Sequence, residues 1–177
     1  NPGLTVVEIM EAIYAKQIKG LYVMGENPAM SDPNANHARE ALAKLDTLIV
    51  QDIFLTETAY LADIVLPASA FPEKTGTFTN TDRRVQLAKK AVNPPGEAKQ
   101  DLWIIQELAN RLGLNWDYSG PDEVYDELSG CMDSMKNITW ERLVREGAVT
   151  YPCDDEKRPG NEVIFGEGFP TNDKKGR

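Results

Sequence analysis

The sequence of 177 residues contains only two cysteines and one histidine, so it has few side chains that could hold a metal ion. Cys131 and Cys153 are separated by 22 positions and belong to no pair with zinc-ligand or cluster spacing. This argues against a zinc site or an iron–sulfur cluster held wholly by this chain. We therefore expect no metal ligands here, and two free thiols that are buried or partly buried.

Other features are missing as well. No apolar run approaches the roughly 18 residues of a membrane-spanning helix, and no opening segment resembles a signal peptide. The net charge is −9 with no sustained basic run, which argues against nucleic-acid binding. The sequence also has no Ser/His/Asp set and no GxGxxG motif, so we assign no catalytic residue.

The most informative stretch is residues 20–52, where two short apolar runs flank about twenty polar and helix-favouring residues. The runs are residues 21–24 and 47–50, and their length and apolar character are typical of buried parallel strands. A third run, residues 63–67, follows. The spacing predicts an α/β fold: a Rossmann-like, mostly parallel sheet flanked by helices, followed by an irregular, loop-rich extension.

In such a sheet a nucleotide-like ligand binds outside the carboxyl ends of the strands. Gly25 and Asn27 follow the first strand, where they either form a simple turn or approach a ligand closely. Gln51 and Asp52 end the second strand, and Asp52 either accepts a ribose hydroxyl or merely begins a loop.

Helix starts supply further candidates. Asp32 and Pro33 predict the start of a helix running to about residue 44, so Ser31 is either part of the cap or a donor to phosphate. A later helix is predicted over residues 102–112, with Asp101 as its N-cap.

The sequence resembles the molybdopterin oxidoreductase family, and most of all the large, catalytic subunit of formate dehydrogenase. Four ordered motifs carry the resemblance, and together they are very specific for the family. They are YVMGENP at residues 22–28, VQDIFLTET at 50–58, ADIVLP at 62–67 and EKTGTFTNTDRRVQ at 73–86.

The resemblance implies a molybdenum or tungsten ion held by two molybdopterin guanine dinucleotides, and a 4Fe-4S cluster elsewhere in the full chain. This chain resembles the second half of the central cofactor-binding region and lacks the cluster motif and the metal-ligating residue. We therefore expect a fragment that is inactive alone. Residues 1–113 would grip the dinucleotide, with a loop-rich insertion at about 68–100. Residues 114–177 would form a helical and irregular extension that leads toward a missing carboxy-terminal barrel.

By the same resemblance, cofactor contacts fall on Gly25, Asn27, Ser31, Gln51, Asp52 and Asp101. The Asp101 carboxylate would accept from the ring N–H and the exocyclic amine of guanine together. This function competes with its predicted capping role.

Three hypotheses follow. The first is the cofactor-binding part of a formate dehydrogenase, which oxidises formate to carbon dioxide. Its partners are the rest of the same subunit and electron-transfer subunits, in the cytoplasm or alternatively the periplasm. The second is the same domain of another family member, such as a nitrate reductase or the large iron–sulfur subunit of complex I with an empty site. The third is a free-standing nucleotide-binding module.

Overall fold

The computed structural model describes residues 3–176, which divide into two compact units. Unit 1 comprises the described residues up to Glu73 together with Val92–Leu114. Unit 2 comprises Lys74–Ala91 and the described residues from Asn115 onward. The sequence analysis placed segment 74–91 inside an insertion of the first domain. In the structure it groups with unit 2, because one of its strands pairs with a strand much later in the chain.

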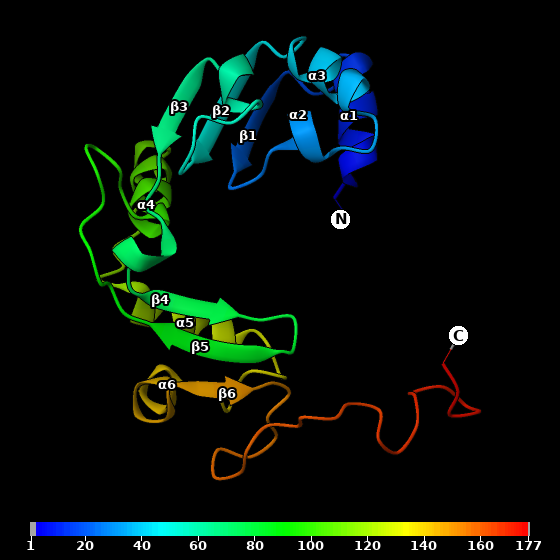
Figure 1. Cartoon of the computed structure of the whole chain (residues 1–177), viewed down its shortest axis with the longest axis vertical. Helices are drawn as coiled ribbons and strands as arrows, with labels where there is room; N and C mark the ends of the chain where they lie inside the picture. Colours follow the sequence, from blue (N-terminus) through cyan, green and yellow to red (C-terminus); the bar gives the residue numbers. More distant parts are fainter. Residues whose placement is uncertain (1–2, 177) are drawn as a thin grey trace. The chain divides into compact units, whose positions relative to one another are not determined.

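Unit 1 is built on a three-stranded parallel sheet in the order β1-β2-β3 (Figure 1). The strands are β1 Gly20–Met24, β2 Thr47–Asp52 and β3 Ile64–Pro67. Their register pairs Val23 with Val50 and Val50 with Val65, so all three carboxyl ends lie at the same edge. The predicted α/β class with a parallel sheet is confirmed.

Helices cover one face of this sheet. They are α1 Val6–Tyr14, α2 Pro28–Ser31 and α3 Ala35–Leu42. Helix α1 begins with a capping box, in which Thr5 and Glu8 exchange hydrogen bonds between side chains and backbone amides. Alternate strand residues point into the core between the sheet and these helices, as expected for strand geometry. The buried members of this core include Met10, Ile13, Val23, Ala38, Ala41, Leu42, Leu48 and Val50.

The helix predicted to start at Asp32 and Pro33 and to run to about residue 44 is present as α3, but it begins later, at Ala35. Asp32 is extended, with ψ 135°, as is usual for a residue that precedes proline. Its carboxylate accepts from the Asn34 N–H at 2.8 Å, and Asn34 in turn accepts from the His37 N–H at 3.4 Å. Pro33 therefore lies between α2 and α3, and Asn34 is the N-cap of α3.

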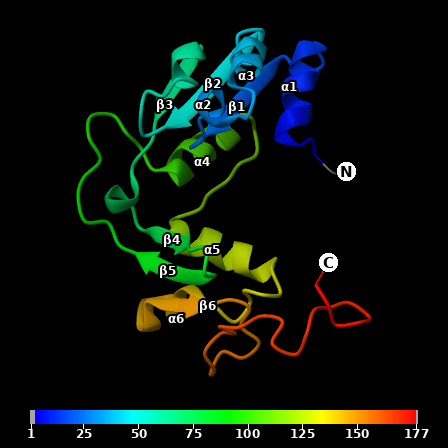
Figure 2. The same cartoon turned by 45° about the vertical axis from the view of Figure 1, so that its right-hand side comes forward.

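Helix α4 Asp101–Arg111 completes unit 1, together with the 3-10 turns η1 Ala59–Leu61 and η2 Phe71–Glu73. Figures 1 and 2 both show α4 beside the carboxyl ends of the strands. The N-cap of α4 is Gln100, so the prediction that Asp101 is the cap is wrong. Asp101 is the first helical residue, and its side chain accepts a hydrogen bond from Gln51 of β2.

Unit 2 contains an antiparallel sheet where the sequence predicted loops and short extended pieces. Its elements are β4 Gly76–Thr79, β5 Arg84–Ala88, α5 Pro121–Gly130, α6 Trp140–Glu146 and β6 Ala148–Thr150. Strand β5 is central and pairs with both β4 and β6. The core includes Val85, Tyr125, Met135, Ile138, Leu143, Val149 and Cys153.

The two cysteines are both free thiols, and only one matches the expected burial. Cys153 is buried in the unit 2 core, whereas Cys131 is exposed just beyond α5. Separately, none of the helices between residues 3 and 176 combines the length and apolar character that a membrane span requires.

Candidate functional site

The carboxyl ends of β1 and β2 form one edge of the unit 1 sheet. Gly25 directly follows β1 and has φ +63°, a conformation that favours glycine. Its N–H donates to the Gln51 carbonyl at 2.9 Å, which keeps the two strands together to their ends. Asp52 ends β2, and its Oδ1 accepts from the Phe54 N–H at 3.0 Å. This edge therefore presents an open glycine backbone and a half-buried carboxylate.

Gln51 connects the sheet to helix α4. Its side chain is fully buried on the sheet face opposite the α1 and α3 core. The Gln51 Nε2 donates to Asp101 Oδ1 at 2.6 Å, and the Tyr22 hydroxyl donates to Gln51 Oε1. The structure therefore brings Gln51 and Asp101 together, although 50 residues separate them in sequence.

The side chain of Asn27 makes its hydrogen bonds to other groups of unit 1. Its Oδ1 accepts from the N–H and the hydroxyl of Thr58, at 3.1 and 2.8 Å. Its Nδ2 donates to Glu57 at 2.6 Å, and this hydrogen bond lowers the pKa of the Glu57 carboxyl. The Asn27 side chain therefore holds the loop after β1 against the loop after β2. Ser31, the last residue of α2, is exposed.

Two residues with roles at this edge were missed by the sequence analysis, namely Tyr22 and Thr58. Tyr22 was assigned only to a strand, but its period-two position places it on the same sheet face as Gln51, a signal that could have identified it. Thr58 is completely buried, and nothing in its local sequence indicates that it meets Asn27.

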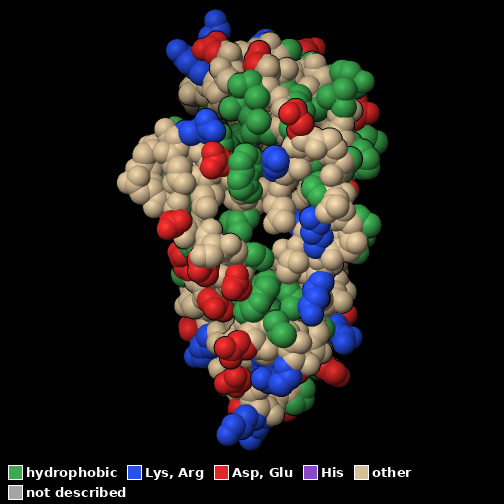
Figure 3. All heavy atoms as spheres, turned by 90° about the vertical axis from the view of Figure 1, so that its left-hand side faces the viewer, with side chains coloured by type: hydrophobic (Ala, Val, Ile, Leu, Met, Phe, Trp, Pro, Cys, Tyr) green, Lys and Arg blue, Asp and Glu red, His purple; other side chains and the backbone are tan. Residues whose placement is uncertain are grey.

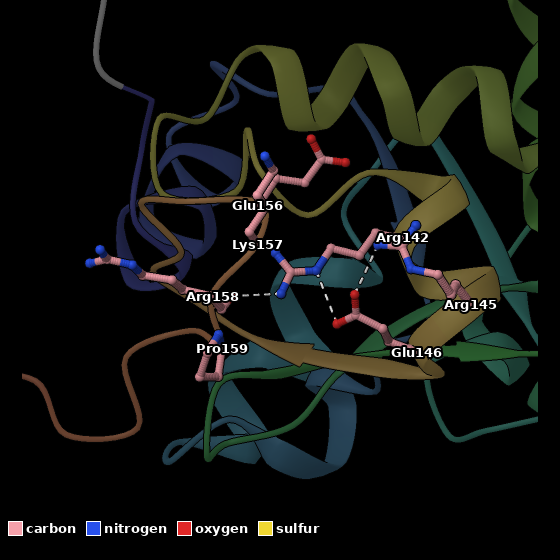
Figure 4. A pocket seen from close by; sticks show the side chains of 7 residues that line it. All are labelled: Arg142, Arg145, Glu146, Glu156, Lys157, Arg158 and Pro159. Carbon is pink, nitrogen blue, oxygen red and sulfur yellow. Dashed lines mark hydrogen bonds and ion pairs between the residues drawn. The ribbon is translucent and has the colours of Figure 1, made fainter.

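Unit 2 contains a hollow of about 510 Å³ lined mainly by charged side chains (Figure 4). Its residues are Arg142, Arg145, Glu146, Glu156, Lys157, Arg158 and Pro159. Glu146 accepts from both Arg142 and Arg145, at 3.1 and 2.9 Å. The Arg142 guanidinium also donates to Asn137 O, Arg158 O and Cys153 Sγ. Its donors are used within the protein, so this arrangement stabilises unit 2 and offers no catalytic group.

Across residues 3–176, no group of three or more His, Cys, Asp and Glu side chains is arranged to hold a metal ion. The chemistry available at the sheet edge is therefore hydrogen bonding by backbone amides, a buried amide and two carboxylates. Such a set suits a nucleotide-like ligand with hydroxyl and N–H donors.

The parallel sheet and the helices packed on it define unit 1 as an α/β fold. Residues 1–111 match the model of the molybdopterin oxidoreductase family, and the chain belongs to that family.

Similar proteins are much longer. The chain is 48% identical over 179 residues to the F420-dependent formate dehydrogenase subunit alpha of Methanocaldococcus jannaschii, covering 100% of this chain and 26% of that protein. It is 40% identical to the assimilatory nitrate reductase catalytic subunit of Bacillus subtilis, covering 98% of this chain and 25% of that protein. Acetylene hydratase from Pelobacter acetylenicus has a similar structure, with a TM-score of 0.65 and 26% identity over 82% of this chain and 20% of that one. The chain thus spans about a quarter or less of each.

We expect Asn27→Ala to destabilise unit 1 by about 2 kcal/mol, because the buried Thr58 N–H and hydroxyl lose their shared acceptor. Native-state amide exchange at Ala29, whose N–H donates to the Thr58 hydroxyl, measures this change. The exposed Ser31 provides the control, since Ser31→Ala should change stability by less than about 0.5 kcal/mol. Equal protection of Ala29 in both variants would refute the structural role of Asn27.

We expect Arg142→Ala to destabilise unit 2 by about 3 kcal/mol, because removal of a buried guanidinium leaves its acceptors without a donor. Amide exchange at Leu143 and Val149 reports the opening of this core. Arg145→Ala is the matched control, because its side chain is 60% exposed and should cost less than about 0.5 kcal/mol. Similar costs for the two variants would contradict a structural role for Arg142.

The ion pairs of Glu146 predict an acid sensitivity. Hydrogen bonds from Arg142 and then Arg145 lower the pKa of the Glu146 carboxyl below that in the unfolded chain. The carboxylate therefore stabilises unit 2 above the ordinary glutamate pKa of about 4.3, and this contribution is lost as the pH falls below it. Protection of Leu143 should fall less steeply in Glu146→Gln than in the unsubstituted chain. Identical acid profiles would show that the carboxylate contributes nothing.

Proposed function

We propose that this chain is part of the cofactor-binding region of a formate dehydrogenase large subunit. The whole enzyme would oxidise formate to carbon dioxide at a molybdenum or tungsten ion held by molybdopterin guanine dinucleotides. Membership of the molybdopterin oxidoreductase family and 48% identity to a formate dehydrogenase subunit alpha support this proposal. The structural observation that carries it is the pairing of Gln51 with Asp101 beside the carboxyl end of β2.

The groups at this edge fit a guanine dinucleotide. Guanine carries a ring N–H and an exocyclic amine. The Asp101 carboxylate has about four lone-pair sites, so it can accept from both of these groups while it also accepts from Gln51. Asp52 can accept from a ribose hydroxyl, and a positive φ with open space at Gly25 lets the backbone approach a ligand.

The remaining two predicted contacts differ in how well they fit. The side-chain oxygen of Asn27 already accepts two hydrogen bonds, so this residue would act by fixing the loop and not by reaching the cofactor. The exposed hydroxyl of Ser31 can donate to a phosphate. We therefore propose Gly25, Ser31, Gln51, Asp52 and Asp101 as the residues that hold the dinucleotide, with Asn27 in support.

When bound, the molybdenum or tungsten cofactor supplies the redox chemistry, and this chain supplies binding and orientation. The metal ligand and the 4Fe-4S cluster would belong to other parts of the same large subunit. Electron-transfer subunits would then accept the electrons.

Exposed apolar surface on unit 1 supports the rest of the subunit as a partner. Parallel sheets are normally covered on both faces, yet Tyr22, Met24 and Ile64 are 38–47% exposed. Figure 3 shows hydrophobic side chains at the surface of the face that it draws. A groove of about 350 Å³ beside Trp103 and Leu66 adds to this apolar surface.

The second candidate is a nitrate reductase, which the 40% identity to the Bacillus subtilis catalytic subunit favours. The two candidates share the proposed dinucleotide contacts and differ in the substrate of the whole enzyme. Steady-state assays of the full-length enzyme with formate and with nitrate separate them. We expect turnover of formate only, and turnover of nitrate alone would overturn the choice of formate.

We expect Asp101→Asn in the full-length subunit to lower cofactor loading while the fold is kept. An asparagine can still accept from Gln51 through its oxygen, but its amide group would meet the guanine amine as donor against donor, costing roughly 1–3 kcal/mol. Loading is measured as molybdenum or tungsten and as guanine nucleotide per chain.

Glu107→Gln is the control for this substitution, because Glu107 lies on the same helix and pairs with Arg111 at 3.1 Å on the surface. It should leave loading unchanged. If Asp101→Asn also leaves both metal and guanine content unchanged, the assignment of Asp101 to the guanine base is wrong.

A further inference from the structure

Three side chains from three elements form one hydrogen-bonded row on the second face of the unit 1 sheet. Tyr22 lies in the middle of β1, Gln51 near the end of β2, and Asp101 at the start of α4. The Tyr22 hydroxyl donates to Gln51 Oε1, and Gln51 Nε2 donates to Asp101 Oδ1 at 2.6 Å. Tyr22 is therefore linked to Asp101 through a buried amide.

The groups at the two ends of this row determine which group donates and which accepts in each of its hydrogen bonds. An ionised carboxylate can only accept, so the Gln51 amide must turn its nitrogen toward Asp101 and its oxygen toward Tyr22. The Tyr22 hydroxyl must then donate. Burial, and after it the charge of Asp101, raise the pKa of Tyr22, so its hydroxyl keeps its proton at neutral pH.

Packing alone does not explain a glutamine at this position. The Gln51 side chain is fully buried, and a buried amide is costly unless its donors and acceptors are satisfied. Tyr22 is 38% exposed, so its hydroxyl could bond to water without Gln51. The arrangement instead uses both side chains to hold one carboxylate at the binding edge.

We propose that Tyr22 is a positioning residue, which acts through Gln51 to hold the Asp101 carboxylate where it accepts from a guanine base. This inference rests on the proposed function. Without the phenol hydroxyl, the buried Gln51 oxygen loses its donor, and the amide is held from the Asp101 side alone. The Gln51 side chain, and the carboxylate bonded to it, would then be held less firmly in the position from which Asp101 accepts from the base.

The test uses the full-length subunit loaded with cofactor, and it measures how fast guanine nucleotide is lost during incubation in dilute buffer. Tyr22→Phe removes only the hydroxyl and should speed this loss about threefold to tenfold, the factor for one hydrogen bond. Tyr60→Phe is the matched control, because Tyr60 is a strongly exposed tyrosine of the same unit. It should leave the rate unchanged.

A double-substitution cycle separates positioning from general stability. In an Asp101→Asn background, Tyr22→Phe should change the rate of loss by less than about twofold, because the two residues act through one contact. An equal effect of Tyr22→Phe in both backgrounds would overturn the proposal, as would no effect in the original subunit.

A second background covers the case in which Tyr22→Phe weakens the fold. Gln51→Leu removes the amide and keeps an apolar core, so adding Tyr22→Phe to it should have no further effect on the loss of guanine nucleotide. If Tyr22→Phe speeds the loss of guanine nucleotide further in the Gln51→Leu background, Tyr22 does not act through Gln51. A correctly folded, metal-loaded subunit without guanine nucleotide would overturn the proposed function itself, and this inference with it.

Discussion

The parallel pairing of β2 with both of its neighbours is the constraint on which unit 1 depends. Parallel register places the carboxyl ends of all three strands at one edge, so the loops after them must meet there. Hydrogen bonds from Thr58 to Asn27 then hold the loops after β1 and β2 together, and a hydrogen bond from Gln51 to Asp101 joins β2 to α4. The binding edge is thus a consequence of the sheet, and its side chains come from segments distant in sequence.

Each unit contains a buried polar group, and the two groups have different roles. In unit 2 the Arg142 guanidinium links α6 to the segment around Cys153 and Arg158, and its N–H groups donate hydrogen bonds within the protein. In unit 1 the buried Gln51 amide points a carboxylate toward the edge where a ligand would bind. Hydrogen bonds offset the free-energy cost of burying both groups. Only the Gln51 amide is bonded to a carboxylate that is suited to bind a ligand.

Local sequence patterns predicted what depends on local physics. The three strands and the position of α4 were predicted from apolar runs and helical spacing, with shifts of one or two residues. The strand pairing in unit 2 was missed, since β5 finds its partner β6 some sixty residues later. The start of α3 was placed too early, because a proline after Asp32 also suits a helix start.

The binding edge was only partly predictable for the same reason. Gly25 and Asp52 follow strands directly, so their position could be inferred from the chain order. The internal role of Asn27 depends on Thr58, which no local pattern identifies, and Tyr22 enters only through the sheet face it shares with Gln51. The contacts proposed for Gly25, Ser31, Gln51, Asp52 and Asp101 stay predictions.

The most direct test of the account is hydrogen–deuterium exchange of the full-length subunit, compared between its cofactor-loaded and cofactor-free forms. The central claim is that the strand ends of unit 1 contact the dinucleotide. It predicts slower exchange on loading at residues 25–27, 52–54 and 101–103, with no change in the β4–β5 hairpin. Unchanged exchange at all three segments, with protection confined to other parts of the subunit, would contradict it.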